Sequence, residues 1–362
     1  AGIGLAEEFR ASTWLPATDI HSRYAIEWYA EKVAEETDKE ITFQTFYGGA
    51  LLPATSTLKG TGDGVAHLGF VTSANVTADL PVANALSAFQ FIELDPIVLG
   101  MAYADYIMND PTGYKDWRQH GVVPVGGFGN APTTFHCRSA TPPTSMNDLR
   151  GLRVRFPGGV ITQFARDLGM IPVTMPAGEM YQALQTGQVD CASIYPTFLN
   201  IDNSLGEVTR STLLINIGTN FIQPSHVFNA EFWQNLTTDQ RQILLNEAAR
   251  AMAKMEVDYL GSQATAIEMA KATGHVFAEP DQSIKDAIDQ WVANGVGGMA
   301  DEARNTYGIE DPEVLFASFQ SYIDKWKPIV SSLKNRLDEE ELNEMILTHL
   351  IAPIDVATYG MD

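Results

Sequence analysis

The hydrophobic positions in the first part of the chain change their period several times, from alternation to helical spacing and back. Segments 8–13 and 41–49 alternate and predict strands, while 20–37 carries an apolar stripe at helical spacing. A helix over 51–60 and a short buried strand over 65–72 complete a β-α-β-α-β order. That order is typical of a parallel sheet with helices on its faces.

The same plan begins again after Gly121. Alternating or short apolar runs predict strands at 122–128, 133–139, 151–156, 172–175 and 189–194, and amphipathic runs predict helices at 160–169 and 178–187. The two units share a plan but no repeated sequence, so the fold class is α/β with two lobes.

The last part of the chain is helical. A capping-box pattern at Thr237 opens a helix that can run to Gly274, about 50 Å at 1.5 Å per residue, which is longer than one lobe is wide. Such a helix would connect the lobes. Further helices are predicted at 282–293, 312–335 and 339–351.

These elements divide the chain into four parts. Residues 1–125 form the first α/β lobe, which is completed by about 215–250, and residues 126–214 form the second lobe. Residues 237–274 form the long connecting helix, and 275–362 form a helical segment packed on the lobes.

Composition and charge exclude several partners. The chain has 362 residues with a net charge of −22, from 45 acidic and 23 basic side chains, and such a surface repels nucleic acid. No apolar run reaches the roughly 18–20 residues that cross a bilayer, so no membrane insertion is expected. The start, AGIGLAEEF, lacks a signal-peptide pattern, so a signal either was removed or never existed.

Cys137 and Cys191 are the only cysteines. Two small buried hydrophobic residues are the favoured interpretation, and a disulfide in an oxidising compartment is the alternative if their strands are neighbours. No cysteine or histidine spacing fits a zinc site, and we expect neither a metal nor a cofactor.

Arg155 is the strongest candidate for function. It ends a predicted strand directly before a Pro-Gly-Gly turn into a helix, at the edge of an α/β sheet where ligands bind. A guanidinium and the free N–H groups of a helix start together favour an anion, above all a carboxylate. No GxSxG, GxGxxG, phosphate loop or HExxH occurs, and Glu179 and Asp190 fit a helix-start acid and a turn acid better than a catalytic pair.

The stretch LRGLRVRFPGG followed by MPAGEMYQALQTGQVD resembles the solute-binding proteins of tripartite ATP-independent periplasmic (TRAP) transporters, of the DctP-like type. The resemblance covers most of residues 9–275, more weakly in GDGVAHLGFV and FYGGALL. It implies a two-lobed fold like that of type II periplasmic binding proteins, a mature periplasmic protein without its signal peptide, no enzymatic activity and delivery of a small organic acid to TRAP membrane permease subunits. It also implies that Arg155 binds the ligand carboxylate.

Departures from the family pattern narrow the chemical class of ligand that is expected. Some members carry a second arginine where this chain has Ala131, with Arg138 nearby, and an acidic residue where it has Ser193, Ile194 and Tyr195. The less polar site suggests a monocarboxylate with an apolar or aromatic part.

Loop ends supply the remaining candidates for the ligand site. These are Trp14, Phe70 and Thr72 in the first lobe, Phe156 beside Arg155, and Asn220 and Phe221 where the chain returns to the first lobe. Two alternatives remain: a binding protein of an ABC importer, and a small-acid lyase or isomerase on a doubly wound fold.

Overall fold

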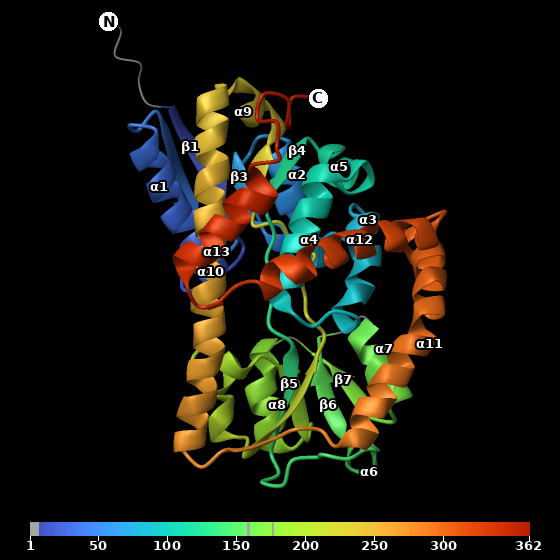
Figure 1. The fold of residues 1–362 in the computed structure, drawn as a ribbon. Coiled ribbons are helices and arrows are strands. Elements are labelled where there is room, and N and C mark those ends of the chain that lie inside the picture. The colour runs from blue at the N-terminus through green and yellow to red at the C-terminus, as the bar shows by residue number, and fades with distance from the viewer. Residues whose placement is uncertain (1–6, 158–159, 176) are drawn as a thin grey trace, which may run out of the picture.

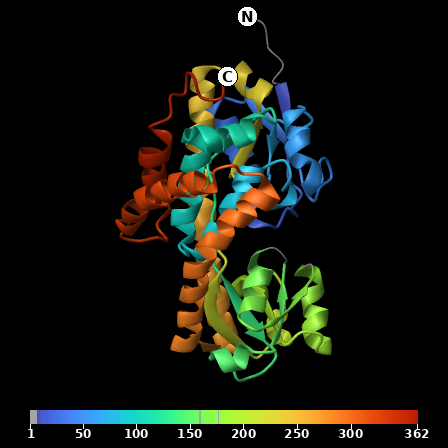
Figure 2. The ribbon, with the colours of Figure 1, turned by 90° about the vertical axis from the view of Figure 1, so that its right-hand side faces the viewer.

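The protein is built from two separate sheets, one in each of two lobes that lie one above the other (Figures 1 and 2). The computed structural model describes residues 7–157, 160–175 and 177–362. Gly158 and Gly159 of the predicted Pro-Gly-Gly turn lie outside the described residues, as does the start of the chain up to residue 6.

The sheet of the first lobe has the strand order β2-β1-β3-β10-β4. Its strands are β1 (Glu7–Ser12), β2 (Ile41–Phe46), β3 (Leu68–Gly69), β4 (Val122–Val125) and β10 (His226–Asn229). The first three are parallel as predicted, but β10 is antiparallel to both of its neighbours. The parallel arrangement predicted for these three strands is therefore confirmed, and the sheet as a whole is mixed because β10 enters it only after the chain has passed through the other lobe.

The sheet of the second lobe is also mixed, in the order β11-β9-β5-β8-β6-β7. Its strands are β5 (Thr133–Cys137), β6 (Arg153–Phe156), β7 (Ile171–Thr174), β8 (Cys191–Ile194), β9 (Ser211–Ile217) and β11 (Val276–Ala278). Strands β6, β7 and β8 run parallel, so their carboxyl ends share one edge, and β5 runs against β8.

Short helices cover both sheets. In the first lobe they are α1 (Tyr29–Glu36), α2 (Thr57–Gly62), α3 (Pro81–Leu86), α4 (Pro96–Asn109), α5 (Pro111–Arg118) and α9 (Ala230–Asn235). In the second lobe they are α6 (Met146–Leu149), α7 (Val160–Asp167) and α8 (Met180–Thr186). A π-helical segment, η1 (Ser22–Trp28), leads into α1, and a 3-10 turn, η6 (Pro196–Leu199), follows β8.

The predicted long helix is present as α10 (Thr238–Ala272), with the expected capping box at Thr237. Figure 1 shows it along the full height of the molecule. In its first half, Leu244 O accepts a hydrogen bond from the hydroxyl of Tyr29 in the first lobe (3.1 Å). In its second half, Gln263 Oε1 accepts one from the backbone N–H of Thr197 in the second lobe (3.2 Å). The helix therefore joins both lobes.

A second helix, α11 (Gln282–Tyr307), also spans the two lobes, on the other side of the molecule (Figure 1). Trp291 packs on Phe164 of the second lobe, with ring centres 5.1 Å apart, and Ala303 belongs to the core of the first lobe. The chain ends with α12 (Pro312–Ser331) and α13 (Glu339–Ile346) on the first lobe, where Trp326 donates to Asp105 of α4 (2.9 Å).

Cys137 and Cys191 form a disulfide, so the favoured interpretation as two free buried cysteines is wrong. The two residues are direct partners in the antiparallel register of β5 and β8, with their Cα atoms 4.1 Å apart. That pairing is a long-range feature of the fold, which local sequence could not decide.

Candidate functional site

A cavity of about 640 Å³ lies where the two lobes meet. The first lobe contributes the loop after β1 and the residues after β3, and the second lobe contributes the segment from Tyr195 to Asp202 after β8. Three residues of the crossing segments and two of α10 close it: Asn130, Asn220, Gln223, Tyr259 and Ser262. Both lobes, the crossing segments and α10 therefore all line one cavity, whose volume is within the range of small-molecule sites.

Aromatic rings make up much of the cavity wall. Trp14 and Phe70 lie on the first-lobe side, and Tyr195, Phe198 and Tyr259 lie on the side of the second lobe and α10. Trp14 and Phe70 have ring centres 6.3 Å apart, and the rings of Tyr195 and Tyr259 meet edge to face at 6.3 Å. These walls suit a ligand with an apolar or aromatic part.

Arg155 lies in β6, between Val173 of β7 and Ala192 of β8, and only 3% of it is exposed. Its Nε donates to the carbonyl of Met175 (2.9 Å) and its Nη1 to the carbonyl of Ser193 (3.3 Å). Burial lowers the pKa of this guanidinium to about 10, which still leaves it charged at neutral pH.

Arg155 forms no ion pair with any residue that the structure describes. Arg153, two residues earlier in the same strand, does form an ion pair, because it binds both carboxylate oxygens of Asp190 (3.0 and 2.6 Å). A buried cation with only carbonyl partners lacks the counterion that buried charges usually have. This is the property expected of an anion-binding arginine.

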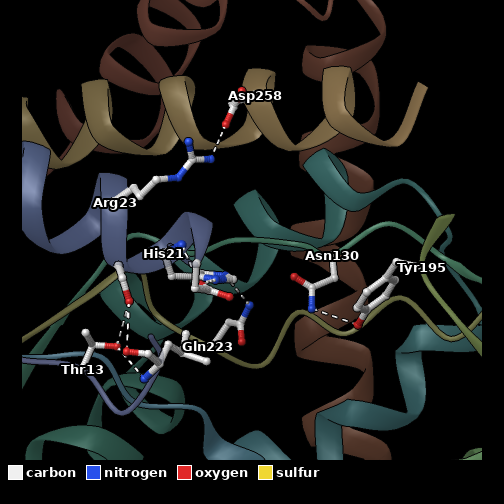
Figure 3. Close-up of polar contacts among 10 residues, drawn as sticks. Thr13, His21, Arg23, Asn130, Tyr195, Gln223 and Asp258 are labelled. Atoms are coloured by element: carbon white, nitrogen blue, oxygen red, sulfur yellow. Dashed lines mark hydrogen bonds and ion pairs between the residues drawn. The ribbon is translucent and has the colours of Figure 1, made fainter. Parts of the chain in front are cut away.

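Tyr195 links Arg155 to the cavity. Its hydroxyl accepts a hydrogen bond from Asn130 Nδ2 (3.0 Å), and Asn130 is fixed in turn by its backbone N–H to Asn220 O (2.7 Å) (Figure 3). Burial raises the pKa of Tyr195, whereas the hydrogen bond from Asn130 and the charge of Arg155 oppose that rise. Arg155 thus lies close to this wall residue without lining the cavity itself.

The first-lobe side of the cavity carries polar groups as well. Asp19 Oδ1 accepts from His21 N (2.9 Å) and is 3.0 Å from His21 Nδ1, and the other ring nitrogen of His21 lies 3.4 Å from Gln223 Nε2. At the rim, Arg23 donates to Asp258 of α10 (2.7 Å). Figure 3 shows His21 and Gln223 on one side of the view and Asn130 and Tyr195 on the other.

Five of the predicted ligand residues line the cavity: Trp14, Phe70, Thr72, Tyr195 and Asn220. Sequence reasoning missed Asp19, His21, Asn130, Gln223 and Tyr259 as cavity residues. Tyr259 had a usable signal, because it continues the apolar stripe of the long helix at the height where the lobes meet. Asn130 and Gln223, in the crossing segments, had none.

Four of the predicted ligand residues lie outside the lining of the cavity. Phe156 alternates with Arg155 and is therefore fully buried in the core of the second lobe, and Phe221 stacks on Phe319 in the first-lobe core. Arg138 follows Cys137 at the opposite end of the sheet, exposed and near Gly187. Ile194, half-buried, packs against the cluster around Met180, so none of these four residues lines the cavity.

Alternative chemistry finds no support in the described residues. They contain no group of three or more histidine, cysteine, aspartate or glutamate side chains able to hold a metal ion. His136 is fully buried and bonds Thr212 (2.8 Å), which makes it a core residue. Among the described helices, none combines the length and the apolar character required of a membrane span.

Comparison with known proteins identifies the family. The model of the bacterial extracellular solute-binding protein family 7 (DctP) matches residues 11–297, so the chain belongs to this family. The family is one of TRAP periplasmic solute-binding proteins, which confirms the expected family, location and non-enzymatic class.

Two curated relatives match parts of the chain. The C4-dicarboxylate-binding periplasmic protein DctP of Rhodobacter capsulatus is 31% identical over 109 residues, 30% of this chain and 32% of its own length. A solute-binding protein of Chromohalobacter salexigens is 24% identical over 240 residues, 64% of this chain and 66% of its own length. The chain thus spans about one third and just under two thirds of these relatives.

Solved structures confirm the fold. A TRAP periplasmic solute-binding protein of Desulfovibrio salexigens superimposes with a TM-score of 0.76 at 20% identity, covering 91% of this chain and 99% of that one. A TRAP solute-binding protein of Rhodoferax ferrireducens, in complex with copurified benzoate, gives 0.71 at 18% identity (90% and 99%). One from a marine metagenome, specific for aromatic acid ligands, gives 0.72 at 19% identity (90% and 100%).

Proposed function

We propose that this protein captures a small organic acid in the cavity between its lobes and delivers it to the membrane permease of a TRAP transporter. The ligand is a monocarboxylate with an apolar or aromatic part. The observation that carries the proposal is Arg155, a buried guanidinium without a carboxylate partner among the described residues. The ligand's carboxylate supplies that partner, since a planar guanidinium fork matches a carboxylate in two parallel hydrogen bonds.

The aromatic walls support the second half of the proposal. Rings of Trp14, Phe70 and Tyr259 surround the space that the rest of the ligand would fill. Relatives of the same fold have been solved with benzoate, 3-hydroxybenzoate and mandelate. Each of these molecules joins one carboxylate to an aromatic ring.

Closure of the lobes is the mechanism we infer. A ligand that touches Phe70 of the first lobe and Arg155 of the second favours the arrangement in which both contacts exist at once. Tyr195 lines the cavity and Arg155 does not, so binding of a carboxylate at Arg155 requires this wall of the cavity to rearrange. The closed, loaded protein is then the form that the permease recognises.

The first test is Arg155→Ala, followed by titration calorimetry with benzoate, 3-hydroxybenzoate and mandelate. Removing one partner of a buried charged pair costs about 3–5 kcal/mol, so affinity for the bound acid should fall by at least about 100-fold. Arg155→Lys should also bind poorly, because lysine keeps the charge and loses the fork.

Arg138→Ala is the matched control. It removes the same charge from the same sheet, but at the exposed end away from the cavity. Affinity should be unchanged in this variant. Equal binding by wild type and Arg155→Ala would refute the proposed site.

A further inference from the structure

The charges around the cavity are unevenly shared between its two sides. On the second-lobe side Arg155 has no carboxylate partner in the described chain, whereas at the rim Arg23 is already paired with Asp258 (2.7 Å). On the first-lobe side the side chain of Asp19 lines the cavity and is 29% exposed. Two carboxylates thus line the cavity, that of Asp19, partly buried on the first-lobe side, and that of Asp202, exposed on the second-lobe side, while Arg155 is not part of the lining.

Asp19 is held rigidly in place. Its Oδ1 accepts from the backbone N–H of His21 (2.9 Å) and contacts the ring of the same residue (3.0 Å). The ring of His21 is packed between Phe70 (4.7 Å) and Phe128 (5.0 Å), so it cannot turn away easily. Both contacts to His21 use Oδ1 of Asp19, and the backbone of Ser22 also stabilises the carboxylate, so Oδ2 is the oxygen left to accept a hydrogen bond from a ligand.

Asp19 is ionised at neutral pH. Burial alone would raise its pKa, but the hydrogen bonds and the charge of His21 outweigh that effect and hold the pKa below its usual value. A fixed, partly buried negative charge repels a second one nearby more strongly than an exposed charge does, because solvent screens it less.

We propose that Asp19 is a specificity-determining residue, which excludes ligands with a second carboxylate and accepts a hydrogen bond from a hydroxyl group at the ligand's far end. The inference rests on the proposed function, because it assumes that the first carboxylate binds at Arg155. It assigns the ligand class as hydroxy-substituted monocarboxylates. Selection against dicarboxylates then comes from a repulsive contact built into the site.

The experiment compares 3-hydroxybenzoate with isophthalate, which differ only by a hydroxyl against a carboxylate at the same ring position. Dissociation constants are measured by calorimetry for wild type and Asp19→Asn at pH 8, above the range in which histidine usually titrates. Wild type should prefer 3-hydroxybenzoate, and the Asp19→Asn variant should narrow that preference by at least about tenfold, through tighter binding of isophthalate. Asp19→Ser is a second variant that removes the charge.

Asp63→Asn is the matched control, since Asp63 is an exposed aspartate of the first lobe that does not line this cavity. Its preference should match that of wild type, because a solvated charge is well screened. The proposal is overturned if wild type binds isophthalate as tightly as 3-hydroxybenzoate, or if both Asp19 variants keep the wild-type preference.

Arg155→Ala separates this inference from the proposed function. Loss of both probes in that variant, with an unchanged preference in Asp19→Asn, would refute only the role of Asp19. Undiminished binding in Arg155→Ala would refute the carboxylate site, whatever the Asp19 variants do.

Discussion

At the scale of single residues, the second lobe contains a buried guanidinium whose described hydrogen-bond partners are backbone carbonyls. Arg155 stands out from its position at the end of a strand, and the structure adds that it is buried and lacks an anion in the described chain. The same reasoning placed Phe156 and Arg138 near the ligand, although strand alternation turns the first into the core and the register of β5 carries the second to the far edge. Nearness in sequence is a poor guide to nearness at a sheet edge.

The disulfide makes a prediction at the same scale. It closes a loop between residues 54 positions apart, and a cross-link of that span restricts the unfolded chain. The double variant Cys137→Ala/Cys191→Ala should therefore lose about 2–4 kcal/mol of unfolding free energy, measured by urea denaturation. Adding a reductant to wild type should also lower the urea concentration at the midpoint of unfolding. Equal midpoints for wild type and the double variant would contradict the assignment of the disulfide.

At the scale of elements, the amphipathic helices α1 and α7 were predictable, whereas the fully buried helix α4 was not. The α10 capping box and the start of α11 match expectation, since their patterns are local. Helix α4 was missed because it is buried on every side, which leaves no polar face and hence no helical period. Its start carried a usable signal, as Asp95 caps the helix and Pro96 follows in its first turn.

Substitution by alanine at two glycines inside helices should change the unfolding free energy in opposite directions. A Cβ at Gly261 of α10 meets nothing within 4 Å, so Gly261→Ala should add about 0.5–1 kcal/mol of unfolding free energy by helix propensity. A Cβ at Gly100 of α4 would lie 2.7 Å from the backbone N of Gly129, so Gly100→Ala should cost about 1–3 kcal/mol. Urea denaturation of both variants checks the signs, and stabilisation by Gly100→Ala would contradict the packing of α4.

At the scale of the whole molecule, the sequence indicated two lobes and a connecting helix, but not where the chain crosses from one lobe to the other. Local patterns predict each sheet as a β-α-β unit, whereas β10 enters the first sheet late and β11 reaches the second only after α10. These crossings place Asn130, Asn220 and Gln223 around the cavity. Asn130 and Gln223 leave no local pattern, because their positions depend on where both lobes lie, whereas Asn220 was predicted from its place where the chain returns to the first lobe.

One buried carboxyl ties the stability of this assembly to pH. Glu256 of α10 is 4% exposed, and its Oε1 has no hydrogen-bond partner among the residues that the structure describes. Burial raises its pKa well above the usual value, the charge of Asp95 adds to that rise, and Arg336 opposes it. A group whose folded-state pKa is raised stabilises the fold below its unfolded pKa, near 4.5, and loses that contribution as the pH rises through the folded value.

Glu256→Gln, which mimics the neutral acid, should therefore raise the unfolding temperature at pH 8 relative to wild type, and the two proteins should converge near pH 4.5. Glu268→Gln, on an exposed turn of the same helix, is the control that should show no such pH-dependent gain. Thermal unfolding at both pH values decides the matter. A gain of equal size under the acidic and the alkaline condition would show that shape or packing, and not the ionisation of this carboxyl, explains the stabilisation.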